Sequence, residues 1–256
     1  MSLPQLAILF VAAILGGTLN SVAGGGTFFT VPALIVIGVL PITANATSTV
    51  ALWPGSLAST GAYRRELVQQ KRGVLYLLVG TSLIGGILGA LLLVNTSQST
   101  FLLLLPYLLL MATLLFTLSP YITARLRVGS IEKASLSWPT IIGVSVAQLI
   151  IAIYGGYFGG GIGILMLATL AMMGMQNIHM MNAVKTLLTV CINGVAIILF
   201  ILKGIVDWPL AILMIVGAVI GGYGGAYFAR KIDQKWVRLF VTVVGISMTI
   251  YFFVRR

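Results

Sequence analysis

Apolar runs about 20 residues long recur from one end of this 256-residue chain to the other. A helix of that length crosses the ~30 Å hydrocarbon core of a bilayer, because each residue adds about 1.5 Å. Charged residues make up only 7% of the chain, whereas soluble domains usually carry about 25%. The sequence therefore leaves no room for a sizeable soluble domain and predicts an all-α integral membrane protein.

Hydropathy divides the chain into ten apolar segments, two of which are short. The segments cover residues 6–23, 28–39, 44–62, 74–94, 101–119, 139–158, 162–173, 181–202, 208–229 and 236–254. The second and seventh have only about 12 residues, too few to span comfortably. Each follows a glycine triplet, at 24–26 and at 159–161. The pattern predicts 8–10 membrane segments, with broken or re-entrant half-helices after the triplets.

Three motifs occur twice, in the same order and at nearly the same spacing. The glycine triplets are 135 positions apart, the motif Gly85-Gly86-x-x-Gly89-Ala90 returns 136 positions later at Gly221, and Asn45-Ala46 returns 137 positions later as Asn182-Ala183. A shared spacing indicates an internal duplication. We therefore predict one membrane domain built from a first repeat at 1–119, a connecting loop at 120–136 and a second repeat at 137–256.

Each predicted repeat has five segments, so tandem copies are expected to lie upside down relative to each other. Basic residues are concentrated in the loops at 64–72, 120–136 and 230–235, which the positive-inside rule assigns to the cytoplasm. The loop at 203–207 has no net charge and is expected outside, as are both chain ends. The net charge of +11 is thus explained by topology rather than by nucleic-acid binding. Inverted repeats with interrupted short segments are typical of secondary transporters.

Several other functions are disfavoured by residues that the sequence lacks. A single cysteine, Cys191, and a single histidine, His179, cannot form an intramolecular disulfide or a structural zinc site, so no metal or cofactor is expected. Gly-x-Ser-Gly and Gly-x-Gly-Asp protease motifs are absent, and one histidine offers little acid–base chemistry. The protein is therefore not expected to be an enzyme. The first apolar run has no basic region before it and is expected to be a retained span.

Lys185 is the most informative polar residue, because it lies inside the apolar segment at 181–202. A charge at membrane depth costs roughly 3 kcal/mol. The four acidic residues, Glu66, Glu132, Asp207 and Asp233, all fall at loops or segment ends and cannot be its partner at that depth. We therefore predict that Lys185 forms one wall of a site for an anion that crosses the membrane.

Polar residues accompany Lys185 at helical spacing. Asn182, Lys185, Thr189 and Asn193 form a stripe on one helix face, and Asn45, Ser48, Leu52 and Ser56 repeat it in the first half. Lys185 therefore corresponds to Ser48. The alternatives are that these polar residues only link helices, at about 0.6 kcal/mol each, or that the lysine extends to the membrane interface.

The glycine triplets add a second element to the predicted site. Half-helices are expected to begin near Thr27 and Ile162, and their N-termini would offer unpaired amides and partial positive charge to an anion. The predicted binding residues are Lys185, Asn182, Asn45, Ser48, Gly25, Gly26, Thr27, Gly160, Gly161, Thr189, Asn193 and Asn20, with Ser21, Gln148, Tyr154, Tyr157 and His179 as weaker candidates. Alternatively, the glycines only permit tight helix packing. That interpretation is preferred for the small-residue pairs Gly85/Gly89, Gly217/Gly221 and Gly221/Gly225.

These motifs resemble one known family. The stretch from Asn20 to Leu34, Asn45-Ala-Thr-Ser48, the stretch from Gly155 to Gly163 and Asn182-Ala-Val-Lys185 resemble the TauE/SafE family over almost the entire chain. The resemblance implies a multi-pass protein of the prokaryotic inner membrane that exports a small sulfur-containing anion, such as sulfite or an organosulfonate like sulfoacetate. The resemblance also implies that the functional residues are the glycine triplets, Asn45, Ser48, Asn182 and Lys185.

The expected partners are the small anionic substrate and the lipid bilayer, and a homo-oligomer is compatible with the sequence. A proton relay usually needs a carboxylate at membrane depth, and the sequence shows none there. The interior-negative membrane potential is therefore the expected driving force, at about 2.3 kcal/mol per charge at 100 mV. Proton or sodium coupling through His179, Lys185 or unwound carbonyls is an alternative. A passive anion channel and, with less support, a membrane-embedded enzyme or a scaffold are the alternative functions.

Overall fold

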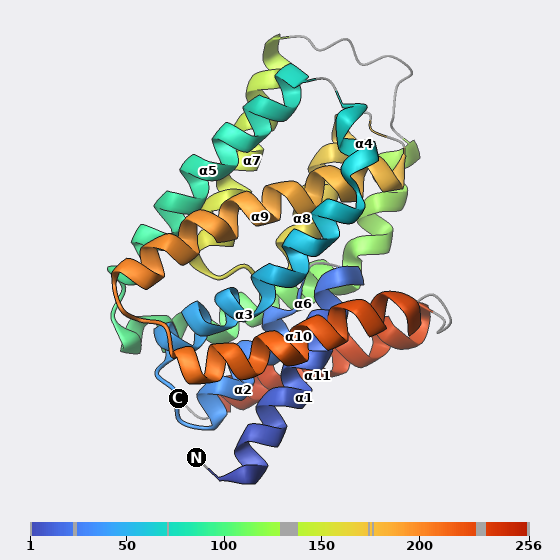
Figure 1. The fold of residues 1–256 in the computed structure, drawn as a ribbon. Helices are drawn as coiled ribbons and strands as arrows, with labels where there is room; N and C mark the ends of the chain where they lie inside the picture. The colour runs from blue at the N-terminus through green and yellow to red at the C-terminus, as the bar shows by residue number, and fades with distance from the viewer. Residues whose placement is uncertain are drawn as a thin grey trace.

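The computed structural model describes residues 2–22, 25–70, 72–128, 138–173, 175, 177–228 and 234–254, and helices are the only regular secondary structure in these ranges (Figure 1). The helices are α1 (Leu3–Val22), α2 (Thr27–Val36), α3 (Pro41–Ala62), α4 (Arg64–Val68), α5 (Arg72–Val94), α6 (Gln98–Val128), α7 (Trp138–Tyr157), α8 (Ile162–Met172), α9 (Ile178–Leu202), α10 (Trp208–Phe228) and α11 (Gln234–Val254). The all-α fold predicted from composition is confirmed.

Each of the ten predicted apolar segments corresponds to one helix, and α4 is an additional short helix. The two segments that were predicted to be short form the shortest of these ten helices, with 10 residues in α2 and 11 in α8. They begin at Thr27 and Ile162, the positions expected from the glycine triplets. One boundary differs: α6 continues to Val128, so residues 120–128 of the predicted connecting loop are helical. The apolar pattern ends near residue 119, but a polar helix end in water retains its backbone hydrogen bonds.

The two glycine breaks have different backbone conformations. At the second break, Gly159 and Gly161 have φ values of +80° and +77°, a left-handed conformation that side chains other than glycine rarely adopt. At the first break, Gly26 has a right-handed φ of −57°, so the reason for glycine is space. A Cβ on Gly26 would collide with the carbonyl oxygen of Gly16 in α1. The first break thus allows α1 and the start of α2 to pack backbone to backbone.

The helices form two groups with the same internal pairing. In one group α1, α2 and α3 pack together with α10, and in the other α7, α8 and α9 pack together with α5. Helices α3 and α9 join the groups, and α6 pairs with α11. The second-last helix of each predicted half therefore packs against the other half: α5 packs against α7, and α10 packs against α1. This exchange agrees with the predicted duplication, while the opposite orientation of the halves stays a prediction.

Glycines allow α5 to pack closely against α7, and α10 against α1. A Cβ on Gly85 of α5 would lie 2.8 Å from the carbonyl oxygen of Leu149 in α7, and a Cβ on Gly221 of α10 would collide with the carbonyl oxygen of Ile14 in α1. Leu149 and Ile14 are 135 positions apart, as the glycine triplets are. The small-residue contacts predicted at these glycines are present, and they occur at matching places in both halves.

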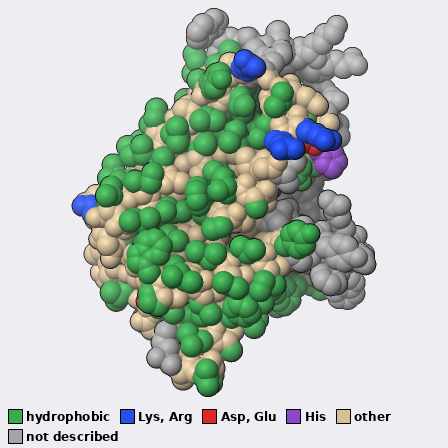
Figure 2. All heavy atoms as spheres, in the orientation of Figure 1, with side chains coloured by type: hydrophobic (Ala, Val, Ile, Leu, Met, Phe, Trp, Pro, Cys, Tyr) green, Lys and Arg blue, Asp and Glu red, His purple; other side chains and the backbone are tan. Residues whose placement is uncertain are grey.

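The surface is rich in apolar side chains, as expected for a lipid-facing protein (Figure 2). Four helices in the described ranges are long and apolar enough to span a membrane, at Leu3–Asn20, Arg72–Val94, Gln98–Leu118 and Ile178–Leu202, and five shorter apolar helices accompany them. Most of the Lys and Arg side chains visible in Figure 2 lie around the end that carries α4, beside the histidine. The protein is therefore an integral membrane protein, and its basic end agrees with the predicted cytoplasmic position of loop 64–72.

Candidate functional site

A small cavity lies where the two glycine breaks meet. It is lined by Asn20, Thr27, Thr49, Leu52, Phe158, Gly159, Ile162, Thr189 and Asn193. Its volume is about 10 Å³, the room that roughly one water molecule needs. Its described walls combine hydroxyl and amide groups with three apolar side chains, and none of these described lining residues is charged. The cavity can thus offer neutral hydrogen-bond donors to a small solute.

Both predicted repeats contribute to this cavity at matching positions. Thr27 and Ile162, the first residues of α2 and α8, are 135 positions apart, and Leu52 and Thr189 on α3 and α9 are 137 apart. The breaks themselves are adjacent, because a Cβ on Gly159 would lie 3.9 Å from Oγ1 of Thr27. The cavity therefore lies at the interface between the two halves rather than within either half.

The crossing of α3 and α9 beside the cavity is fixed by a tryptophan. Nε1 of Trp53 donates a hydrogen bond of 3.1 Å to the carbonyl oxygen of Val190. Trp53 and Val190 are 137 positions apart, so each helix meets the other at its own repeat-equivalent residue. A nearby bond of 3.0 Å from Nδ2 of Asn20 to Oγ of Ser56 links α1 to α3. These contacts hold three of the cavity-lining helices together.

Lys185 is buried close to the cavity but does not line it. It is only 3% exposed and lies one helical turn before Thr189, whose hydroxyl donates a 2.9 Å hydrogen bond to the carbonyl oxygen of Lys185. No ion pair joins its ammonium to Glu66 or Asp207, the two acidic residues that the structure describes. The described part of the chain thus leaves this buried positive charge without a carboxylate partner.

Ser48, the repeat equivalent of Lys185, has a structural contact instead. Its hydroxyl is 2.5 Å from Oγ1 of Thr30, and Thr30 also donates to the carbonyl oxygen of Gly26 at 3.2 Å. Ser48 therefore ties the start of α2 to α3 at the first glycine break. The two predicted halves use equivalent positions differently: the Ser48 hydroxyl has a hydrogen-bond partner within its own half, whereas Lys185 carries a charge that no described carboxylate pairs with.

Asn45 performs a similar role at the second break. Its Nδ2 donates to the carbonyl oxygen of Tyr157 at 3.0 Å, whereas its buried Oδ1 has no partner. Tyr157 is the last residue of α7, so the bond ties α3 to the end of that helix. Its repeat equivalent, Asn182, is half-buried near the start of α9. Asn45 thus positions the second break from the opposite half of the protein.

The structure brings only part of the predicted set together. Asn20, Thr27, Thr189 and Asn193 line the cavity, and Gly25, Gly26, Gly160 and Gly161 belong to the two breaks beside it. Lys185, Asn45, Ser48 and Asn182 lie outside its lining. Among the weaker candidates, Gln148 donates to Ser82 at 2.8 Å, His179 is exposed, and the side chain of Ser21 lies outside the described residues.

Sequence reasoning missed three residues that shape this region, Thr30, Thr49 and Phe158. Thr49 and Phe158 line the cavity, and Thr30 is the partner of Ser48. Thr30 follows Thr27 by three positions on the same helix face, which was a usable signal. Phe158 precedes the second glycine triplet and had no polar character to mark it.

Tyr154 holds the second glycine break in place, and its hydroxyl should contribute more to the free energy of unfolding than the hydroxyl of Tyr157 does. The Tyr154 hydroxyl donates to the carbonyl oxygen of Gly160 at 2.7 Å, while the Tyr157 hydroxyl makes only a 3.5 Å contact with Thr96. We expect Tyr154→Phe to lower the free energy of unfolding by about 1 kcal/mol, the usual net contribution of an intramolecular hydrogen bond. Tyr157→Phe is the matched control and should cost less in the same detergent-unfolding measurement. Equal losses would contradict this role.

Comparison with known proteins identifies relatives over nearly the whole chain. The family described as "Sulfite exporter TauE/SafE" matches residues 9–252. A probable membrane transporter protein, ORF9, from Sinorhizobium sp is 29% identical over 96% of this chain and 91% of its own length. Probable membrane transporter proteins from Haemophilus influenzae and Escherichia coli K12, the latter named YfcA, are 28% and 29% identical over 95% of this chain and over 92% and 88% of their own lengths.

Proposed function

We propose a substrate and a mechanism on the premise that this chain belongs to the TauE/SafE family and is a membrane transporter of that type. The proposal is export of a small sulfur-containing anion, sulfite or an organosulfonate such as sulfoacetate, across the prokaryotic inner membrane. The substrate binds between the two halves, at the meeting of the glycine breaks. The description of the family and the names of the relatives support a transport function, and the site residues support an anionic substrate.

One observation supports an anionic substrate: Lys185 is buried, has no carboxylate partner among the described residues, and lies one helical turn from a cavity lined by both halves. A charge at membrane depth costs roughly 3 kcal/mol unless it is compensated. A bound anion would compensate it, and the hydroxyl and amide groups of the cavity would replace part of the anion's hydration. The N-termini of α2 and α8 begin at this cavity and add partial positive charge.

The size of the cavity favours a carrier over a channel. A volume of about 10 Å³ holds roughly one water molecule and is too small for sulfite or a sulfonate. Binding therefore requires α3, α9 or the half-helices to move apart. In inverted-repeat transporters, alternating access is the movement of one repeat relative to the other around the site. We propose the same mechanism for this protein. The membrane potential drives the exit of an anion from a negative interior.

Ligand-induced stabilisation tests the proposed site. Sulfite, sulfate, sulfoacetate, taurine-derived anions and carboxylates are added singly to purified wild type, Lys185→Ala and Lys203→Ala. We expect at least one sulfur oxoanion to raise the unfolding temperature of wild type and of Lys203→Ala, whose lysine is exposed at the end of α9. The shift should disappear in Lys185→Ala, because its buried positive charge is gone. Retained stabilisation in Lys185→Ala would show that the lysine is outside the site.

A further inference from the structure

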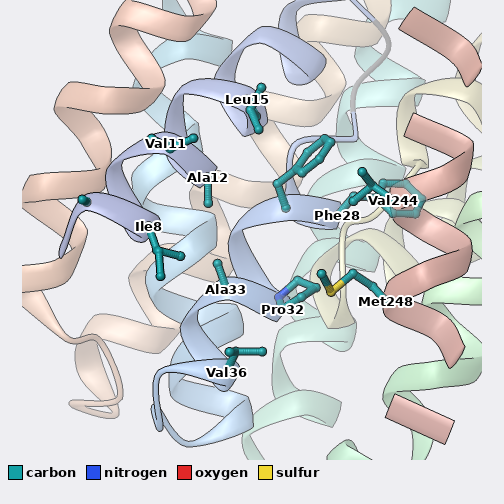
Figure 3. Close-up of a pocket in the computed structure, with 12 residues that line it drawn as sticks. Ile8, Val11, Ala12, Leu15, Phe28, Pro32, Ala33, Val36, Val244 and Met248 are labelled. Carbon is teal, nitrogen blue, oxygen red and sulfur yellow. The ribbon is translucent and has the colours of Figure 1, made fainter. Parts of the chain in front are cut away.

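An apolar groove of about 460 Å³ runs between α1, α2 and α11 (Figure 3). It is lined by Ala7, Ile8, Val11, Ala12, Leu15, Phe28, Phe29, Pro32, Ala33, Val36, Val244 and Met248. In Figure 3 the side chains of Ile8, Pro32 and Met248 border the same hollow from the three different helices. Each of these twelve described lining side chains is apolar, so water that entered the groove would find no hydrogen-bond partner among them. The groove therefore suits a hydrocarbon occupant.

The groove opens onto the surface that faces lipid. Its rim carries Ile8, Val11 and Val36, which are 54%, 53% and 47% exposed. Ile8 and Val11 belong to a helix that is long and apolar enough to span the membrane. The apolar lining is thus continuous with the exposed apolar surface of α1, and the acyl chains of the bilayer can reach it without crossing a polar barrier.

The matching place in the second half is closed by protein. Helix α8 packs along α6, and Gly161 at its start is close enough to Ala112 that an added Cβ would lie 3.5 Å from the Ala112 side chain. In the first half, α2 and α11 meet through the stacked rings of Phe29 and Phe240, whose centroids are 5.9 Å apart, and they are not packed along their length. The groove is the space left by this difference.

We propose that this groove is a binding site for one acyl chain of a bilayer phospholipid, which separates α2 from α11 in this conformation. An unfilled apolar space of this size would forfeit dispersion contacts along its whole lining. A recessed, fully apolar groove between three helices accepts a single flexible chain, whereas a second copy of the protein would need a projecting apolar ridge to fill it. The acyl chain thus covers the apolar side of α2, whereas the corresponding side of α8 is covered by direct packing against α6.

Photolabelling of the full-length protein in liposomes tests the site. The probe is a phosphatidylcholine with a diazirine near the end of one acyl chain, and labelled positions are mapped on peptides. We expect at least five-fold more label on residues 32–36 of α2 and on residues 244–248 of α11 than on residues 167–171 of α8, the stretch that matches 32–36. Equal labelling of the α2 and α8 stretches would overturn the proposal, as would an unlabelled groove in a protein that is dimeric by native mass spectrometry.

Filling the groove gives an independent test. Ala33→Trp places an indole in the hollow that the Ala33 methyl group faces in Figure 3, and should lower the label on α11 at least five-fold. The control is Val219→Trp, because Val219 of α10 is exposed and apolar but lies outside the groove. It should leave the label on α11 unchanged, and persistence of that label in folded Ala33→Trp would overturn the proposal. These measurements need no substrate, so they stay valid if the proposed export function is wrong.

Discussion

Lys185→Met should lower anion export at least about 100-fold, with the protein still folded. The substitution removes the one buried charge of the proposed site, where compensation is worth roughly 3 kcal/mol, and about 1.4 kcal/mol corresponds to a factor of ten. Folding should persist, because methionine fills similar space and has no charge to bury. Export is measured as substrate flux from liposomes at a clamped potential without an ion gradient, alongside the unfolding temperature.

The matched control for this experiment is Lys203→Met, which removes an exposed lysine just beyond α9 and should leave flux within a factor of about two, since exposed charges contribute little. Undiminished flux in Lys185→Met would refute the proposed role of the buried ammonium. A wild type that carries no flux under the clamped potential, yet binds the anion, would instead reject the uncoupled mechanism and favour proton or sodium coupling.

Gly89→Ala should destabilise the protein strongly, whereas Gly80→Ala should not, although both glycines lie on α5. A Cβ on Gly89 would collide with the carbonyl oxygen of Ile153 and lie 2.8 Å from the backbone nitrogen of Tyr157, both in the α7 region. Backbone atoms cannot move aside as side chains do, so α5 and α7 must separate. We expect the free energy of unfolding to fall by about 3 kcal/mol, the upper end of the cost of overpacking.

Gly80 meets nothing within 4 Å of its added Cβ, so Gly80→Ala adds a methyl group to open space. Alanine also favours the helix over glycine by up to about 1 kcal/mol. Stability should therefore be unchanged or slightly higher. Both variants are compared with wild type by unfolding in the same mixed micelles. A similar loss in both variants would show that glycine flexibility, rather than the α5–α7 contact, determines stability here.

The helices and the two breaks could be predicted from local sequence because their causes are local. An apolar run of the right length is helical in a bilayer, where every backbone amide must be satisfied within its own segment. A glycine triplet interrupts such a run, and the structure begins α2 and α8 at the expected Thr27 and Ile162. The end of α6 at Val128 was missed, because hydropathy detects the end of the apolar surface rather than the end of the helix.

The candidate site could be predicted only in part, because its members come from distant segments. The stripe that includes Lys185, Thr189 and Asn193 was correctly assigned to one helix, but only the last two face the cavity. Ser48 was predicted as a binding residue from its correspondence to Lys185, yet its hydroxyl is occupied by Thr30. The correspondence between the predicted repeats indicates where a residue lies on its helix. It does not indicate which hydrogen-bond partner the side chain has.

The order of apolar runs and glycine triplets determined by itself that this chain is a helical membrane protein in which a short helix follows each triplet. Those properties depend on segment length and backbone freedom, which adjacent residues define. The internal duplication that the paired motifs indicate stays a prediction. Only the tertiary structure decided that α5 and α10 pack against the opposite half and that the two breaks share one cavity. It also decided that α8 packs along α6, whereas an apolar groove remains between α2 and α11. These properties depend on contacts between segments that are far apart in the sequence, such as Gly85 with Leu149 and Gly221 with Ile14. A local sequence pattern does not show how well two such distant surfaces fit together.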